Sequence, residues 1–262
     1  MRALSIGATG MSAQQTNVEV ISNNIANMNT NAYTRRRAEF QDLMYQNLRR
    51  VGSQTSEDGT IVPAGIQLGL GVRTAAVYRL LQQGDMVHTR NTFDMAIEGR
   101  GYFQIELPGG RDTAYTRDGS FQLSDIGQIV THDGYTVLPG ITIPQDAIDV
   151  TINAQGEVWV KLDGQTALSN VGQLQIATFP NEAGLEAIGG NMFLETPASG
   201  AANVAAPGTI GYGSISQYFL EGSNVNVVSE ITELVRAQRA YEMNSKVIQT
   251  ADQMMSTLTN LR

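Results

Sequence analysis

Two stretches of helical periodicity, one at each end of the chain, limit what this sequence can fold into. In the first stretch, apolar side chains recur every seven positions, at Leu4, Met11, Val18 and Ile25. A sevenfold repeat is the spacing of a helix that presents one narrow apolar stripe to a neighbour. We therefore expect a helix over residues 1–28. A run of asparagines from Asn23 to Asn31 ends the pattern, because short amide side chains bond freed backbone groups and tolerate left-handed backbone.

The C-terminal stretch repeats this plan over residues 223–262. Its apolar side chains fall on steps of three and four residues, and the stripe includes Ile231, Leu234, Tyr241, Ile248 and Met255. Asn226 is suited to cap the start of the helix, because its side chain can accept a hydrogen bond from a free backbone N–H. Glu233 and Arg236 lie three residues apart, a spacing at which opposite charges pair on a helix.

Between the two helices the periodicity changes twice. Residues 29–70 show no helical repeat and are rich in polar residues and glycine, so we expect an extended linker there. From residue 71 to 222 apolar and polar side chains alternate over short segments, and Asp-Gly dipeptides recur at 118–119, 133–134 and 163–164. The predicted fold class is α+β. It comprises long N- and C-terminal helices paired as a coiled-coil-like inner domain, the extended linker, and a mostly antiparallel β outer domain.

Two long helices with little else to pack on favour self-assembly. A lone pair of amphipathic helices has a thin core, so its remaining apolar positions require neighbours. Where the contacting patches of two copies differ, the contact is head-to-tail, and such contacts build helical filaments when the rotation does not close. We therefore expect a homo-oligomer in the form of a helical polymer.

The composition is poor in the side chains of catalytic and metal sites. The chain has no cysteine and only two histidines, His88 and His132, so we expect no metal and no cofactor. The net charge of −8 argues against nucleic acid as a partner, and the short basic run is typical of a solvated or subunit-facing strip. The N-terminus lacks the pattern of a cleaved secretory signal, and no stretch reaches the roughly 18 apolar residues that span a bilayer.

An enzyme acting on cell-wall polysaccharide is the alternative from another function class. Its carboxylate couple would be Glu57 with Asp58, or Asp112 with Asp118, because glycoside hydrolysis uses two acids about 5–10 Å apart. Acidic residues beside glycine are also what β-turns use, and we favour that interpretation. The glycine-rich stretches lack the spacing of a dinucleotide-binding loop and no phosphate-binding lysine motif is present. We therefore expect no enzymatic activity and no small-molecule substrate.

Residues 22–46 resemble the N-terminal signature of the bacterial flagellar rod and hook family. Asn27, Thr30 and Tyr33 match its pattern, whereas Ala32 stands where glycine is more usual. Residues 221–255 are similar to the C-terminal signature of the same family, and its matching positions include Asn224, Asn226, Gln238, Arg239 and Tyr241. Ala32 in the N-terminal signature indicates either that the turn there needs no positive φ or that it adopts one at a cost.

The resemblance implies a structural subunit. The length of the chain and the segment Arg49–Gly65 are similar to members that build the distal rod, while a proximal rod or hook subunit stays open as an alternative. The distal rod is a rigid hollow shaft that transmits torque from the motor to the hook and serves as an export channel. The implied partners are proximal rod subunits, the hook subunit with hook-side components, the P-ring and L-ring as a bushing, and the flagellar type III export apparatus.

The same resemblance gives a location and roles. The subunit would lie in the flagellar basal body, in a rod that spans the periplasm to the outer membrane, after export without a cleaved signal. We expect the terminal helices to be mobile in the free subunit and to order on assembly. Residues 49–65 would stiffen the polymer. Arg35, Arg36 and Arg37 would form a basic strip that faces acidic surface on a neighbouring subunit.

Overall fold

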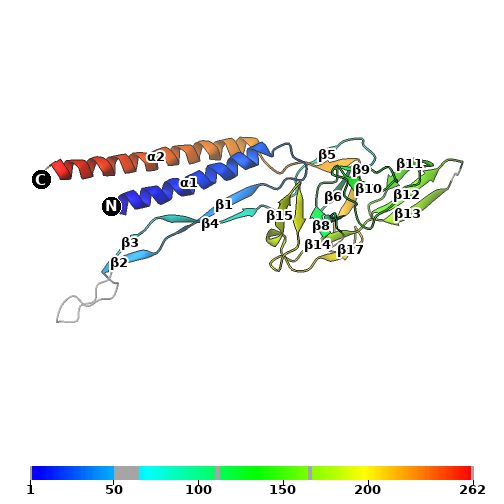
Figure 1. Ribbon diagram of the computed structural model, residues 1–262, viewed down its shortest axis with the longest axis horizontal. Coiled ribbons are helices and arrows are strands. Elements are labelled where there is room, and N and C mark those ends of the chain that lie inside the picture. Colours follow the sequence, from blue (N-terminus) through cyan, green and yellow to red (C-terminus); the bar gives the residue numbers. More distant parts are fainter. Residues whose placement is uncertain (1, 50–64, 110–112, 165–166, 261–262) are drawn as a thin grey trace. The chain divides into compact units, whose positions relative to one another are not determined.

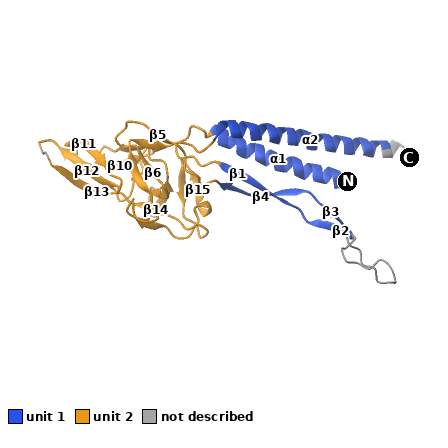
Figure 2. Cartoon of the chain, turned by 180° about the vertical axis from the view of Figure 1, so that it is seen from behind, with its two compact units in different colours: residues 1–26, 36–79, 226–262 blue, residues 27–35, 80–225 orange. Residues whose placement is uncertain are grey.

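The chain forms two compact units in the computed structural model, which describes residues 2–49, 65–109, 113–164 and 167–260 (Figure 2). Unit 1 combines residues 1–26, 36–79 and 226–262, and unit 2 combines residues 27–35 and 80–225. Unit 1 holds both helices, and unit 2 is built from short strands. The predicted α+β class is confirmed, because two long helices accompany many antiparallel strands.

Helices α1 (Arg2–Ala26) and α2 (Val227–Asn260) lie side by side in unit 1 (Figure 1). They are antiparallel, since Gly7 near the start of α1 meets Ile248 in the second half of α2. The predicted cap is confirmed, because the Ser229 N–H donates to Asn226 Oδ1 at 3.1 Å. The predicted ion pair is also present, with 2.7 Å between Arg236 Nη1 and Glu233 Oε1.

Small residues let the two helices approach closely. A Cβ atom added at Gly7 would lie 2.8 Å from Ile248 Cγ1, and one added at Gly10 would lie 2.9 Å from Asn244 Nδ2. Both distances are shorter than van der Waals contact, so glycine is required unless the facing side chain moves. Ala237 and Ala251 are buried on α2.

A two-stranded ribbon occupies much of the segment that the sequence predicts as an extended linker. Strand β1 (Arg36–Asp42) pairs with β4 (Val72–Arg79), and the ribbon continues as β2 (Tyr45–Arg49) paired with β3 (Ile66–Gly69). Residues 72–79, which the sequence places in the β outer domain, thus pair with β1 in unit 1. The ribbon contacts α1, where Val72 N–H donates to Thr9 Oγ1 at 3.4 Å.

Unit 2 is organised around a six-stranded sheet. Its order is β15 (Glu186–Gly189), β16 (Met192–Leu194), β8 (Thr113–Thr116), β7 (Tyr102–Glu106), β14 (Ile176–Thr178), β17 (Asn203–Ala205). A three-stranded sheet adds β11 (Ala147–Ile152), β12 (Glu157–Leu162) and β13 (Leu168–Gln173). Two-stranded pairs join β6 (Met95–Glu98) to β18 (Ser214–Gln217), β5 (Met86–His88) to β19 (Phe219–Glu221), and β9 (Phe121–Leu123) to β10 (Ile129–Thr131). All strand pairs are antiparallel.

The core of unit 2 has two clusters. The larger contains Phe103 and Phe121, whose rings meet edge to face at 5.1 Å between centroids. The smaller surrounds Phe179, which packs edge to face on Tyr102 and Tyr115. Strand β7 contributes to both clusters, because its side chains point alternately to the two faces of the sheet and both faces are buried.

Candidate assembly surfaces

The residues predicted on α1 are less buried than other positions of the helix. Leu4, Met11, Val18 and Ile25 are all half-buried. The fully buried positions of α1 are instead Gly7, Ala13, Ile21 and Asn24. The sevenfold repeat thus falls on half-buried positions, while two small residues, an isoleucine and an asparagine occupy the fully buried ones.

Helix α2 divides its predicted residues between two faces. Leu234 and Ile248 are half-buried on the side of α1. The others are exposed, namely Ile231, Gln238, Arg239, Tyr241 and Met255. Further exposed apolar side chains that the sequence analysis did not select are Val228, Val235, Met243, Val247 and Met254. A second apolar stripe, displaced around the helix from the first, is the signal that could have found them.

The two family-like motifs meet in unit 2 around Asn224. Its Oδ1 accepts a hydrogen bond from Arg35 N–H at 2.7 Å, and its Nδ2 donates to the carbonyls of Leu80 at 3.0 Å and Gln82 at 2.8 Å. Its own N–H donates to the Tyr33 carbonyl at 3.2 Å. One side-chain amide therefore ties together three passages of the chain that are far apart in the sequence.

The turn before Tyr33 carries the departure from the family pattern. Ala32 has φ of +54° and is buried, and its N–H donates to the Glu221 carbonyl at 2.8 Å. The turn therefore does adopt a positive φ, with alanine in it. Just upstream, Thr30 Oγ1 donates to Asn27 Oδ1 at 3.2 Å, so two of the predicted signature residues bond to each other.

A buried ion pair adjoins this turn. Arg117 Nε donates to Glu221 Oε2 at 2.8 Å, and the guanidinium also donates to the carbonyls of Gly99, Gly101 and Ile97. The Gly84 N–H donates to the other Glu221 oxygen at 3.1 Å. Charges taken out of water require such partners, and here several backbone groups of unit 2 supply them.

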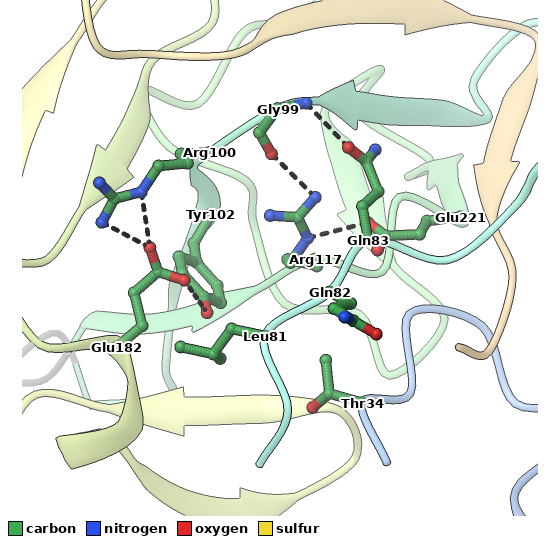
Figure 3. A pocket seen from close by; sticks show the side chains of 10 residues that line it. All are labelled: Thr34, Leu81, Gln82, Gln83, Gly99, Arg100, Tyr102, Arg117, Glu182 and Glu221. Atoms are coloured by element: carbon green, nitrogen blue, oxygen red, sulfur yellow. Dashed lines mark hydrogen bonds and ion pairs between the residues drawn. The ribbon is translucent and has the colours of Figure 1, made fainter. Parts of the chain in front are cut away.

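An open cavity of about 370 Å³ lies beside this pair (Figure 3). On its other side Arg100 pairs with Glu182 at 2.9 Å, and Tyr102 Oη donates to the same carboxylate at 3.2 Å. The charged side chains of the wall thus bond to one another. The arrangement supports a rigid wall and offers no activated nucleophile or base.

The basic run begins at the boundary of the two units. Arg35 is half-buried in unit 2, whereas Arg36 and Arg37 are exposed at the start of β1 in unit 1. Arg37 pairs with Glu39 at 3.2 Å and lies 5.6 Å above the ring of Tyr78. The hydrogen bonds that Glu39 accepts from Tyr78 and Arg37 lower the pKa of the Glu39 carboxyl.

Of the side chains considered for catalysis, the structure describes His88, His132 and Asp118, and the last two line one small pocket of unit 2. Glu57, Asp58 and Asp112 lie outside the described residues. His88 is exposed on β5 with its ring against Phe219, and His132 is exposed beside Asp133. Within the described ranges no group of three or more His, Asp or Glu side chains is placed to hold a metal ion, and neither helix is long and apolar enough over those ranges to cross a membrane.

Three family models match the chain. The flagella basal body rod protein model matches residues 4–34, the flagellar hook protein FlgE/F/G D1 domain matches 96–160, and the flagellar basal body rod FlgEFG protein C-terminal model matches 216–261. The matched ends include the predicted positions on both helices and the turn around Asn224.

Several full-length relatives of 39–61% identity carry the same name. The flagellar basal-body rod protein FlgG of Caulobacter vibrioides is 61% identical over 262 residues, which is 100% of both chains. That of Agrobacterium fabrum is 53% identical over 99% of this chain and 98% of the relative, and that of Bacillus subtilis is 39% identical over 100% and 99%. Identity at this level over whole chains shows common descent and a common fold, so the chain belongs to the FlgG family of flagellar basal-body rod proteins.

Proposed function

We propose that this chain is the structural subunit of the flagellar distal rod and self-assembles into a rigid, hollow helical shaft. The shaft transmits torque from the motor to the hook and serves as an export channel. The full-length similarity to FlgG rod proteins is the observation that carries this proposal. The exposed apolar side of α2 supports it, because such a surface on a soluble subunit marks a protein contact.

In this proposal each part of the chain has a place in the polymer. The two terminal helices, residues 1–28 and 223–262, form the inner tube, and residues 71–222 form most of the outer domain. Residues 29–70 connect neighbouring subunits and stiffen the tube. Part of that segment, residues 50–64, lies outside the described residues. The partners we propose are proximal rod subunits, the hook side, the P- and L-rings, and the type III export apparatus.

A pair of matched substitutions on α2 tests assembly. Met243 is 62% exposed, and aspartate there would place a charge into the proposed subunit contact. We expect Met243→Asp to remove the chain from isolated basal bodies and to abolish swimming, whereas Gln249→Asp, at another exposed position of α2, retains both. Normal incorporation of Met243→Asp would contradict an assembly role for this side of α2.

The position in the rod is tested separately. A peptide tag inserted at the turn Asp163–Gly164 of unit 2 leaves both helices unchanged. Gold labelling of isolated basal bodies is expected to decorate the rod segment next to the hook. Labelling confined to the motor side, or extending over the hook, would assign the chain to a proximal rod or hook role instead.

A further inference from the structure

The side chain of Asn24 connects three elements of unit 1. It lies in the last turn of α1 and is 1% exposed. Its Oδ1 accepts a hydrogen bond from Arg36 N–H at 2.9 Å, and its Nδ2 donates to the Arg36 carbonyl at 2.8 Å. The same Nδ2 donates to Glu230 Oε2 at 3.0 Å. One amide thus binds the first residue of β1 as a neighbouring strand would and also holds the first turn of α2.

The rest of the helix contact discriminates weakly between registers. Most of the fully buried residues of the two helices are small, namely Gly7, Ala13, Ala237 and Ala251, and Ile21, at 5% exposed, is a large exception. Sliding one helix past the other by a turn, about 5.4 Å, would exchange most of these small side chains for similar ones. The two close approaches, at Gly7 and Gly10, face the ends of the flexible side chains of Ile248 and Asn244, which can rotate away.

The contacts of Asn24 do not tolerate such a slide. A shift of one turn would carry the amide beyond hydrogen-bond reach of Glu230, whose side chain is 5% exposed. Buried polar groups that lose partners are costly, and a single buried polar residue is the best-attested device for fixing helix register. We propose that Asn24 is the positioning residue that sets the register of the α1–α2 pair.

The register itself can be read from three contacts. Gly7 faces Ile248, Gly10 faces Asn244, and Asn24 faces Glu230, so residue numbers rise along α1 as they fall along α2, by equal steps to within one residue. Midway between the last two contacts, Asn17 is level with Ala237. Asn17 is half-buried and Ala237 is 2% exposed, as expected for facing positions.

The sequence contains no cysteine, so a disulfide between two introduced cysteines can be measured without interference from others. Asn17→Cys is combined in the full-length chain with cysteine at 233, 237 or 241, and intrachain disulfides are counted after oxidation. Disulfides need Cα atoms within about 7 Å, so the yield reports which positions are level. Oxidation accumulates product from the paired state even when the helices pair for only part of the time. We expect the yield to peak at 237.

Substitutions at Asn24 then decide the proposal. In Asn24→Asp the donor is lost and a second carboxylate faces Glu230, so we expect the yield to spread over 233, 237 and 241 with at least a threefold loss of the peak. Ser22→Asp, an exposed change in the same turn, is expected to keep the peak. Adding Glu230→Gln to Asn24→Asp restores a donor between the two side chains and is expected to restore the peak at 237.

Two results would overturn the assignment. One is a profile that is flat in the parent chain. The other is a peak that stays at 237, undiminished, in Asn24→Asp. If Asn24→Asp loses its helical circular dichroism altogether, Asn24→Ala decides in its place, with a spread profile supporting the assignment and an unchanged peak refuting it. Fluorescence of Trp159, the single tryptophan, reports in each variant that unit 2 is folded.

Discussion

At the residue scale, two ion pairs of unit 2 show how burial decides the value of a charge. The Arg117 and Glu221 side chains are 10% and 3% exposed, whereas the Arg100 side chain of the pair with Glu182 is 65% exposed. Both pairs have short distances and both border the same cavity. The difference lies in the arginines: Arg117 is buried with Glu221, whereas Arg100 is largely exposed, and Glu182, at 10% exposed, also accepts a hydrogen bond from the Tyr102 hydroxyl that remains when Arg100 is removed.

We expect Arg117→Met to lower the free energy of unfolding of unit 2 by about 3–5 kcal/mol, because Glu221 would keep its buried charge without its cationic partner. Arg100→Met is expected to cost about 1 kcal/mol or less. Urea unfolding followed by the fluorescence of Trp159 measures both changes. Equal losses in the two variants would show that the depth of burial does not control the contribution of these pairs.

At the element scale, the helices and many strands were predictable, while the ribbon was not. The helix starting after Asn226 and the helix ending near the asparagine run follow from periodicity and capping chemistry. The ribbon of β1 to β4 escapes such reasoning, because nearly all of its side chains are exposed or half-buried and apolar and polar residues alternate only over short runs such as residues 38–41. Its existence depends on contacts between strands about 30 residues apart.

The residues of the candidate surfaces were also predicted only in part. The resemblance to a family selected Asn224, yet its four hydrogen bonds to two distant passages of the chain follow only from the folded structure. Asn24 and Glu230 were not selected, because a polar residue within an apolar pattern looks like an interruption of it. Their partnership joins positions 206 residues apart, which no local pattern reveals.

A hydrogen bond within the ribbon changes the pKa of Glu39, and that change can be measured. Tyr78 Oη donates to Glu39 Oε1 at 2.8 Å, and this hydrogen bond is the largest cause of the lowered pKa of Glu39. Phenylalanine cannot donate, so Tyr78→Phe is expected to raise the pKa of Glu39 back toward the usual value for glutamate. Carboxyl chemical shifts followed by NMR during a pH titration measure the change. Tyr45→Phe, further along the ribbon, is the control and is expected to leave the pKa of Glu39 unchanged.

At the scale of the whole molecule, charge is divided unevenly between the units. Unit 2 contains 16 of the 25 acidic residues but only 6 of the 17 basic ones, so unit 2 is strongly acidic and unit 1 is slightly basic. Complementary charge between copies favours association and sets its orientation. The exposed Arg36 lies in the basic unit, and its side chain is a better probe than Arg35 or Arg37, whose surroundings would also change.

We expect Arg36→Glu to reduce incorporation into rods several-fold at physiological salt. The free energy of unfolding of the free chain is expected to change by less than about 0.5 kcal/mol. Quantitative immunoblots of isolated basal bodies measure incorporation. Lys161→Glu, a charge reversal on β12 of unit 2, is the control. A loss of thermal stability that parallels the loss of incorporation would assign Arg36 to the fold rather than to assembly.

The pairing of α1 with α2 also has a consequence for the order of folding. Bringing together residues more than 200 positions apart carries a large loop-closure entropy in an unstructured chain. Unit 2 is formed mainly by residues 80–225, and its folding shortens the effective loop before the helices meet. The two helices are therefore expected to pair last, after unit 2 has folded. A subunit that folds in this order keeps its two terminal helices, the segments proposed to bind other copies, apart until unit 2 has folded.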